Sequence, residues 1–397
     1  MSENASSPGL RPNDLLTFVM AVACGLAVAN IYYAQPLLDT LAGDFGINRG
    51  TAGVIITMTQ LGYAAGLMLL VPLGDLLERR RLITVISSVA VLSLVGMAVA
   101  PTSSLFILAA LITGVTAVVA QILVPFAAHM ANDAERGRVV GRVMTGLLLG
   151  ILLARVVSGS ISDLFGWRAV YWIAAVIMLV QVVALRHLLP EESPQSPMRY
   201  AGLLRSVATL VREEPVLRRR IVYGALGFAS FSAFWTTLPF LLAQAPYHYP
   251  DAVIGLFGLL GVAGALCANL AGSLHDRGYS RVGTGLFQAA MGLSFVLMAV
   301  FPENLVAIIV GIIVLDLGVQ GNMILNQGAI YQIRPEARSR ITTAYMTFYF
   351  LGGAAGSAGA AYLFEFAGWI GACSLGIVLG ASGVLFWLRE GASHDCS

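Results

Sequence analysis

The chain has 397 residues and a formal net charge of +2; 58% of its residues are hydrophobic and only 11% are charged. Soluble globular domains carry about 25% charged residues, so this composition excludes a water-exposed globular protein. The 23 basic residues are all arginines, and their placement reflects membrane topology, so the net charge gives no indication of a nucleic-acid partner.

Twelve apolar segments follow one another along the chain, and each is long enough to cross a bilayer as a helix. They cover approximately residues 14–38, 50–73, 82–100, 104–131, 137–163, 168–188, 219–243, 251–274, 281–300, 304–333, 337–364 and 369–388. The predicted fold class is therefore an all-α integral membrane protein with twelve transmembrane helices. We expect no cleaved signal peptide, because the first segment is longer than a secretory one and ends in Tyr33-Ala-Gln35-Pro36.

Arginine is distributed unevenly over the predicted loops. If the N-terminus is inside, only Arg49 and Arg168 fall in outside loops, and Arg155 falls within a helix. The other arginines fall in inside loops or tails, which is a strong positive-inside bias. We therefore predict a multi-pass protein of the cell inner (plasma) membrane with cytoplasmic N- and C-termini.

The longest predicted connection, residues 189–218, differs from the others in composition. It opens with Pro190, Pro194 and Pro197, which prevent a continuous helix. Leucines and valines interspersed with Arg205 and Arg212 follow, and they predict either a short amphipathic helix on the inner membrane face or a flexible linker. The connection divides the chain into an N-terminal six-helix bundle (1–188), a cytoplasmic linker (189–218) and a C-terminal six-helix bundle (219–397).

An internal repeat supports this division. Residues 136–167 recur without a gap 202 positions later, so that Arg136, Asp163 and Gly166-Trp167 return as Arg338, Glu365 and Gly368-Trp369. Such a repeat predicts two pseudo-symmetric bundles, and the even number of spans in each half gives both bundles the same orientation in the membrane.

Two sequence motifs connect the chain to a known family. The loop after the second segment reads Gly74-Asp75-Leu-Leu-Glu-Arg79-Arg80-Arg81, similar to the signature G-x-L-A-D-R-x-G-R-R, and a partial copy follows at Asp276-Arg277. The fifth segment has small residues at the spacing of G-(x)8-G-(x)3-G-P-x-x-G-G, a pattern that lets helices pack closely. They are Gly141, Gly150, Ala154, Ser158 and Gly159, with Arg155 in place of the proline.

With these motifs the chain resembles the major facilitator superfamily (MFS) over essentially its whole length, and within it the bacterial drug/metabolite:proton antiporter branch. The resemblance implies that helices one, four, seven and ten line a central cavity. It also implies that Asp75, Arg79, Arg80, Asp276 and Arg277 form a gate on the cytoplasmic side. The polar and aromatic residues that it places in the cavity are Asn30, Tyr33, Gln35, Gln121, Phe231, Trp235, Gln320 and Asn326.

Two charged residues fall within predicted helices, where each charge costs roughly 3 kcal/mol or more at the centre. Asp316 lies near the middle of the tenth helix, and a carboxylate there could bind and release the proton that couples transport to a proton gradient. A permanently paired structural role is the alternative. Arg155 keeps its proton, so it is a charge anchor that could pair with Asp316, bind an anionic substrate or hydrogen-bond to carbonyls.

The sequence thus predicts a secondary active transporter that exports small organic molecules by proton-coupled alternating access. Uptake of a small metabolite, proton-coupled or facilitated, is the alternative. We expect a functional monomer without cofactor or metal, since the four cysteines lack metal-ligand spacing. We do not expect an enzyme, because no acid–histidine cluster or Ser/His pair lies at membrane depth. The chain also has no G-x-x-x-x-G-K loop for ATP.

Overall fold

The computed structural model describes residues 14–132, 135–191, 199–262, 264, 271–274, 277–334 and 337–394, and within these ranges the chain is helical with no β-strand. Ten stretches of the described residues are long and apolar enough to cross a membrane, which confirms the predicted all-α membrane fold. The helices are α1 (Asp14–Tyr32), α2 (Leu38–Phe45), α3 (Arg49–Leu69), η1 (Val71–Asp75), α4 (Arg79–Val99), α5 (Ser103–Thr116), α6 (Val119–Met130), α7 (Arg136–Phe165), α8 (Trp167–Leu188), α9 (Tyr200–Glu213), α10 (Pro215–Leu242), α11 (Asp251–Leu256), η2 (Phe257–Gly261), α13 (Ser280–Val300), α14 (Leu305–Ile330) and α15 (Arg338–His394).

The helix ends differ from the twelve predicted segments. Helix α1 stops at Tyr32, because the ring of Pro36 would clash with the carbonyl four residues earlier, and the chain starts again as α2. The segment predicted over 104–131 is broken into α5 and α6, and the segment predicted over 251–274 begins as α11 followed by the 3-10 helix η2. The last two predicted segments are two helices that meet at Gly368, whose backbone angles (φ 58°, ψ −149°) are not helical, and the label α15 covers both. Glycine is suited to this backbone geometry because it has no Cβ.

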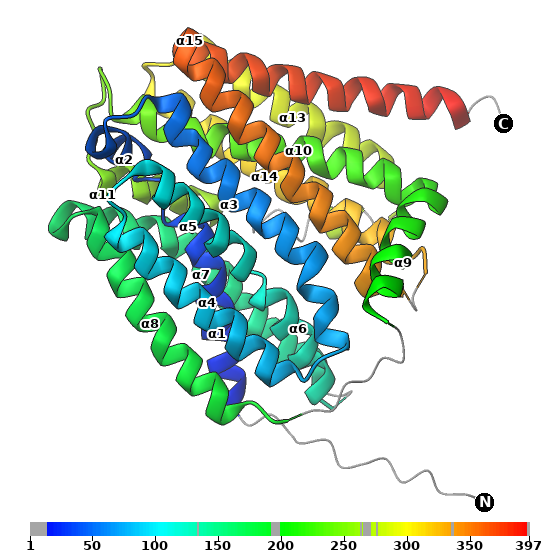
Figure 1. The fold of residues 1–397 in the computed structure, drawn as a ribbon. Helices are drawn as coiled ribbons and strands as arrows, with labels where there is room; N and C mark the ends of the chain where they lie inside the picture. Colours follow the sequence, from blue (N-terminus) through cyan, green and yellow to red (C-terminus); the bar gives the residue numbers. More distant parts are fainter. Residues whose placement is uncertain are drawn as a thin grey trace, which may run out of the picture.

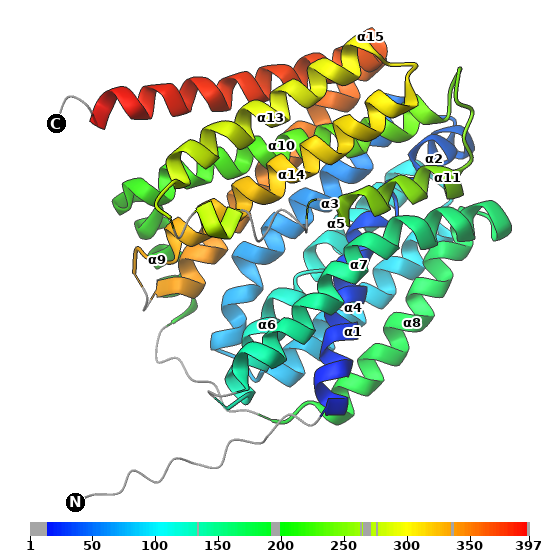
Figure 2. The same cartoon turned by 180° about the vertical axis from the view of Figure 1, so that it is seen from behind.

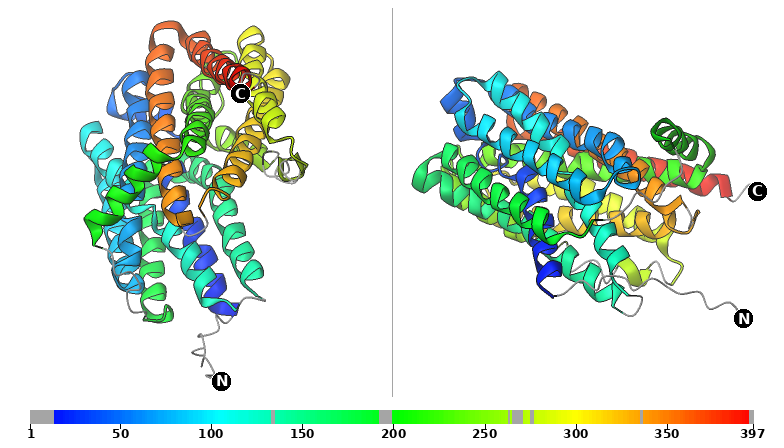
Figure 3. Two further views of the ribbon diagram at one scale, coloured as in Figure 1. Left: turned by 90° about the vertical axis from the view of Figure 1, so that its right-hand side faces the viewer. Right: turned by 60° about the horizontal axis from the view of Figure 1, so that its bottom comes forward.

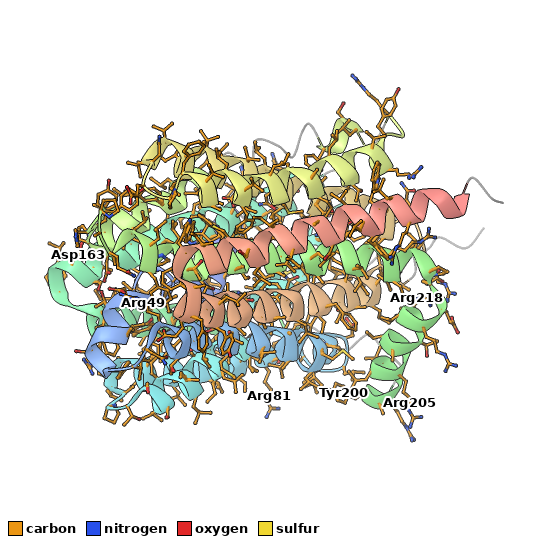
Figure 4. The ribbon with its side chains drawn as sticks, turned by 90° about the horizontal axis from the view of Figure 1, so that it is seen from above. Arg49, Arg81, Asp163, Tyr200, Arg205 and Arg218 are labelled. Atoms are coloured by element: carbon orange, nitrogen blue, oxygen red, sulfur yellow. The ribbon has the colours of Figure 1, made fainter. Side chains whose placement is uncertain are left out.

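The N-terminal helices α1–α8 lie together, and α10–α15 lie against them (Figures 1 and 2). Helix α3 runs alongside α15, and α7 runs alongside α11 and η2. We call the end of the molecule with α2 and the start of α11 the α2 end, and the opposite end the α9 end. Asp163 and Arg49 lie at the α2 end, whereas Arg205 and Arg218 lie at the α9 end (Figure 4).

Helix α9 lies across the α9 end (Figure 3). Its apolar residues Leu203, Val207 and Leu210 are buried, at the spacing of one helical face. The hydroxyl of Tyr200 donates to the carbonyl of Leu69 on α3 at 2.9 Å. At its other end, Glu213 pairs with Arg334 at 3.4 Å. The helix therefore contacts both the N-terminal and the C-terminal helices.

Glycines bring α1 and α7 into backbone contact. A Cβ at Gly150 would overlap the backbone of Gly25, and a Cβ at Gly146 would overlap the backbone of Ala21. At the equivalent place in the second half, Gly352 packs against the carbonyl of Ala225 on α10. Gly141, predicted to belong to the same packing motif, differs: a Cβ there would meet no atom within 4 Å.

Gly150 and Gly141 therefore form a matched pair for testing this packing. We expect Gly150→Ala to lower the stability of the purified protein by about 1–3 kcal/mol, because the new methyl group would force the two helices apart. Gly141→Ala on the same helix should leave stability unchanged or raise it slightly, since alanine favours helix. Thermal unfolding in detergent measures both, and equal melting temperatures for the two variants would contradict the close packing at Gly150.

Candidate functional site

Arg155 lies on α7 where this helix meets the C-terminal helices, and only 3% of the residue is exposed. Its Nε donates to Oε1 of Gln35 at 2.6 Å. Its guanidinium carbon lies 4.1 Å from the ring centroid of Trp235, 4.8 Å from that of Tyr32 and 5.7 Å from that of Phe231. Aromatic faces attract a cation, but these neighbours leave its charge uncompensated.

Asp316 lies at the middle of α14 and is also 3% exposed. Both Arg155 and Trp235 are close enough to act on its carboxylate. A Cβ at Gly261 of η2 would lie 3.2 Å from Oδ2 of Asp316, and a Cβ at Gly258 would lie 3.0 Å from the Arg155 side chain. The two charges therefore face the same short helix. Among the described residues, Asp316 has no ion pair within 4.0 Å.

Several buried polar atoms have no hydrogen-bond partner among the described residues, and three of them lie at these charges. They include Nη2 of Arg155, Oδ1 of Asp316 and Nε1 of Trp235. On α1, the side-chain nitrogen and oxygen of Asn30 also have no hydrogen-bond partner among the described residues. An unsatisfied buried polar group costs about 1–3 kcal/mol, so these atoms favour a ligand, a proton or water. We call Tyr32, Gln35, Arg155, Trp235 and Asp316 the central site.

The other residues predicted to line the cavity are more scattered. Gln121 donates to the hydroxyl of Tyr63 at 3.2 Å, and Gln320 packs near Gly264. Tyr33 lines an apolar groove of about 710 Å³ between α1, α7 and α8, away from the Arg155 guanidinium, which its neighbour Tyr32 contacts.

Asn326 belongs to a second polar cluster, toward the α9 end. Arg220 donates to Thr284 at 3.1 Å and to Oδ1 of Asn326 at 3.5 Å, and the Asn326 amide donates to the hydroxyl of Tyr345 at 3.3 Å. This cluster joins α10, α13, α14 and α15 and is distinct from the central site. Asn326 is fully buried, so its structural role in joining these helices accounts for its position.

In this conformation, the first copy of the predicted gate motif forms one ion pair within the motif and one with the start of the linker. Asp75 and Arg79 form an ion pair at 3.8 Å, and Arg79 also donates to the carbonyl of Gly74. Arg80 pairs with Glu191 at 3.2 Å. In the second copy, Arg277 is exposed, and Asp276 lies outside the described residues.

At the α2 end, two carboxylates form hydrogen bonds between the N-terminal and the C-terminal helices. Asp163, at the end of α7, accepts hydrogen bonds from the amides of Asp251 (3.2 Å) and Ala252 (2.9 Å) at the start of α11. Glu365 on α15 accepts one from the amide of Gly50 at the start of α3 (3.2 Å). Each carboxylate thus satisfies free amides at a helix N-terminus, where the helix dipole also favours negative charge.

These two contacts, which we call the paired clasps, are related by the repeat. Asp163 and Glu365 are 202 positions apart, and so are Gly50 and Ala252. The α11 clasp is reinforced by the Asp251 carboxylate, which accepts from Ser162 at 2.7 Å and from Thr40 at 2.9 Å. Gly159 of the predicted packing motif fits against the carbonyl of Asp251.

Several functional contacts escaped prediction from the sequence. Tyr32 and Tyr33 are adjacent, and periodicity could not show which one faces Arg155. Gly255, Gly258 and Gly261, at the spacing of a 3-10 helix face, are the signal that could have identified the helix facing both charges. The sequence also left the surroundings of Arg155 open, and the structure places it at the contact between the two sets of helices.

A bundle of apolar helices with buried, unsatisfied charges at its centre is typical of a membrane transporter. In the described part of the chain, no group of three or more His, Cys, Asp or Glu residues is arranged to hold a metal ion. The sequence matches the Major Facilitator Superfamily over residues 17–357, and the chain belongs to this family of transporters.

Relatives extend over nearly the whole chain. The "Uncharacterized transporter YgaY" of Escherichia coli O157:H7 is 46% identical over 97% of this chain and 98% of its own length. The "Probable transporter SCO4007" of Streptomyces coelicolor is 36% identical over 93% of this chain and 85% of its own. Among solved structures, a mutant of the nucleoside transporter NupG has a TM-score of 0.75 and 14% identity, covering 96% of this chain and 99% of that one, a likeness of fold.

The paired clasps predict how the α2 end opens. Removing both carboxylates, by Asp163→Ala with Glu365→Ala, should shift the population toward conformations open at this end, because each helix-capping interaction contributes about 1 kcal/mol. Distances between spin labels at Gly43 and Glu303, on opposite sides of the α2 end, would report the shift.

The matched control is Asp44→Ala, because Asp44 lies at the same end but pairs with Arg168 within the N-terminal helices at 3.0 Å. We expect its distance distribution to resemble that of the wild type. An unchanged distribution in the double variant would show that the clasps do not hold this end closed.

Proposed function

We propose that the protein is a secondary active transporter that exports small organic molecules from the cytoplasm by alternating access, coupled to proton entry. In this proposal residues 1–188 and 219–397 are two six-helix bundles and 189–218 is their cytoplasmic linker. The α9 end faces the cytoplasm, in keeping with the arginines near that end, and the protein works as a monomer in the cell inner membrane. The proton gradient, and no cofactor, supplies the energy.

The observation that carries the proposal is the state of Asp316. It is buried at the middle of a membrane-spanning helix, one of its oxygens has no hydrogen-bond partner among the described residues, and a cation lies nearby. A permanently structural carboxylate would be expected to have its hydrogen bonds satisfied. A carboxylate that exchanges a proton with solvent or substrate needs such an open position.

The paired clasps support alternating access. They hold the molecule together at the α2 end by hydrogen bonds between side chains and helix termini, which can break without disturbing either helix set. At the α9 end, Asp75 is paired with Arg79 of its own motif. We propose that this conformation presents the central site to the cytoplasm, and that the opposite conformation releases the clasps and engages the gate motif.

Uptake is the second candidate function, and one observation favours it. The buried Arg155 has an unpartnered nitrogen, so a simple organic anion could bind there. Its binding would be strongest when Asp316 is protonated, because an ionised Asp316 would compete for the same cation. Proton and anion would then travel together, which drives uptake along an inward proton gradient.

The decisive variant is Asp316→Asn, which keeps the shape of the side chain and removes its titration. In proteoliposomes containing a pH-sensitive dye, compounds that move protons through the wild-type protein should move none through the variant, and uphill flux should be lost. Exchange of labelled substrate without a gradient should persist. The surface variant Asp44→Asn should behave as wild type. Uphill flux at wild-type rates in Asp316→Asn would refute the role of this carboxylate.

A further inference from the structure

We propose that the substrate is a small zwitterion with an aromatic or aliphatic body, whose anionic group binds Arg155 and whose amine binds Asp316. This inference rests on the proposed function, because it assigns a substrate class to the same central site. It also fixes the sign of coupling, since the amine and the proton would occupy one carboxylate in turn.

The anionic end follows from the surroundings of Arg155. Its side-chain contacts include the neutral oxygen of Gln35 and the faces of Tyr32, Phe231 and Trp235, and among the described residues Asp316 attracts it without forming an ion pair with it. Nη2 is buried and has no partner in the described part of the chain. A guanidinium presents its N–H groups as a planar fork that matches a carboxylate or phosphate group. The open nitrogen therefore suits an anionic group of a ligand.

The cationic end follows from Asp316. Oδ1 is buried without a hydrogen-bond partner among the described residues, and Oδ2 lies near Gly261, which offers no side-chain donor, so the indole of Trp235 is the neighbouring side chain that can donate to this carboxylate. A protonated amine brings three N–H donors and the opposite charge to such a carboxylate. A bound proton would neutralise the same group. Amine and proton thus exclude each other, which is the requirement for exchanging one against the other.

A singly charged substrate would satisfy only one end of the site. A cation at Asp316 would leave the Arg155 charge uncompensated nearby, and an anion at Arg155 would require Asp316 to stay protonated. Burying an unpaired charge is far more costly than burying a paired one. A zwitterion brings both complementary charges and adds no net charge to the membrane interior, so it fits the two open groups together.

The glycines of α11 and η2 let this segment pack directly against both charged side chains. Gly255 packs against the Arg155 carbonyl, Gly258 against the Arg155 side chain and Gly261 against Asp316. Gly258 and Gly261 are three residues apart in the 3-10 helix η2 and so lie on one face of it, and Gly255 precedes them in α11. Trp235 is buried against the Arg155 guanidinium, whereas Phe231, whose ring centroid lies 6.1 Å from that of Trp235, is only partly buried and can contact the apolar body of a ligand.

Binding to the purified full-length protein tests the inference without requiring transport. The probes are L-phenylalanine and the dipeptide Phe-Ala, each compared with its methyl ester, which lacks the negative charge, and its N-acetyl form, which lacks the positive charge. We expect at least one zwitterion to bind by calorimetry, and both of its blocked forms to bind at least about tenfold more weakly, because each loses one charged hydrogen-bonded contact.

Two variants test which charged residue binds which end of the zwitterion. Arg155→Gln should bind the zwitterion and its methyl ester equally, and Asp316→Asn should bind the zwitterion and its N-acetyl form equally. The control is Arg168→Gln, a half-exposed arginine that pairs with Asp44 at the surface, and it should keep the wild-type preference. The wild-type comparison remains decisive if a variant fails to fold.

The inference is overturned if no zwitterion of the panel binds at millimolar concentration, or if an ester or N-acetyl form binds as well as its parent. These failures are separate from failure of the proposed function, which the proton-flux assay on Asp316→Asn decides. A cationic dye that moves protons through the wild-type protein, with no zwitterion bound, would retain the export function and refute the zwitterion. Tighter binding of the N-acetyl form at low pH would refute it in favour of anion uptake.

Discussion

Two opposite charges are buried at membrane depth without being paired, and the remaining features of the site follow from this arrangement. Arg155 is stabilised by the oxygen of Gln35 and by aromatic faces, and Asp316 lies against the glycines of η2. Neither arrangement satisfies all the donors and acceptors of the charged group. The free-energy cost of burying these groups unsatisfied is of the same order as the free energy of the hydrogen bonds that a ligand or proton would form with them. In the proposed function, binding of a ligand or proton here would change the balance between the two charges.

The repeat shows that each half of the duplicated fold carries one of these charges at a position where the other half has an uncharged residue. Gly114 packs against the backbone of Thr59 in the first half. The residues 202 positions later are Asp316 and Gly261, which also contact each other. In the second half, however, the glycine stands at the position that corresponds to Thr59, and Asp316 stands at the position that corresponds to Gly114. Because Gly261 has no side chain, the carboxylate of Asp316 on the facing helix fits against it. Similarly, Arg155 corresponds to Ser357, whose hydroxyl hydrogen-bonds to Thr57 at 2.8 Å and donates to the carbonyl of Ala354 at 3.1 Å. Equivalent helix crossings therefore have a small uncharged residue in one half and a buried charged residue in the other.

The paired clasps lie at one end of these same crossings. Helix α7 carries both Arg155 and Asp163, and α11 with η2 carries both the capped amides and the glycines that face the charges. Release of the Asp163 clasp would therefore move the helix that packs on Arg155 and Asp316. A change of charge in the central site and a change of contact at the α2 end would thus act on the same pair of helices, as the proposed coupling of binding to opening requires.

The sequence by itself determined that the chain is an all-α membrane protein of this family, because apolar length, positive charge and repeat spacing are local or periodic properties. It also singled out Asp316 and Arg155, since a charge in an apolar helix needs no structure to be recognised. Only the tertiary structure decided that the two face one glycine-lined helix, that Tyr32 and not Tyr33 contacts Arg155, and that Asn326 joins a separate cluster. Those contacts join residues that are far apart in the chain, and they depend on how the helices are rotated and how closely their backbones approach.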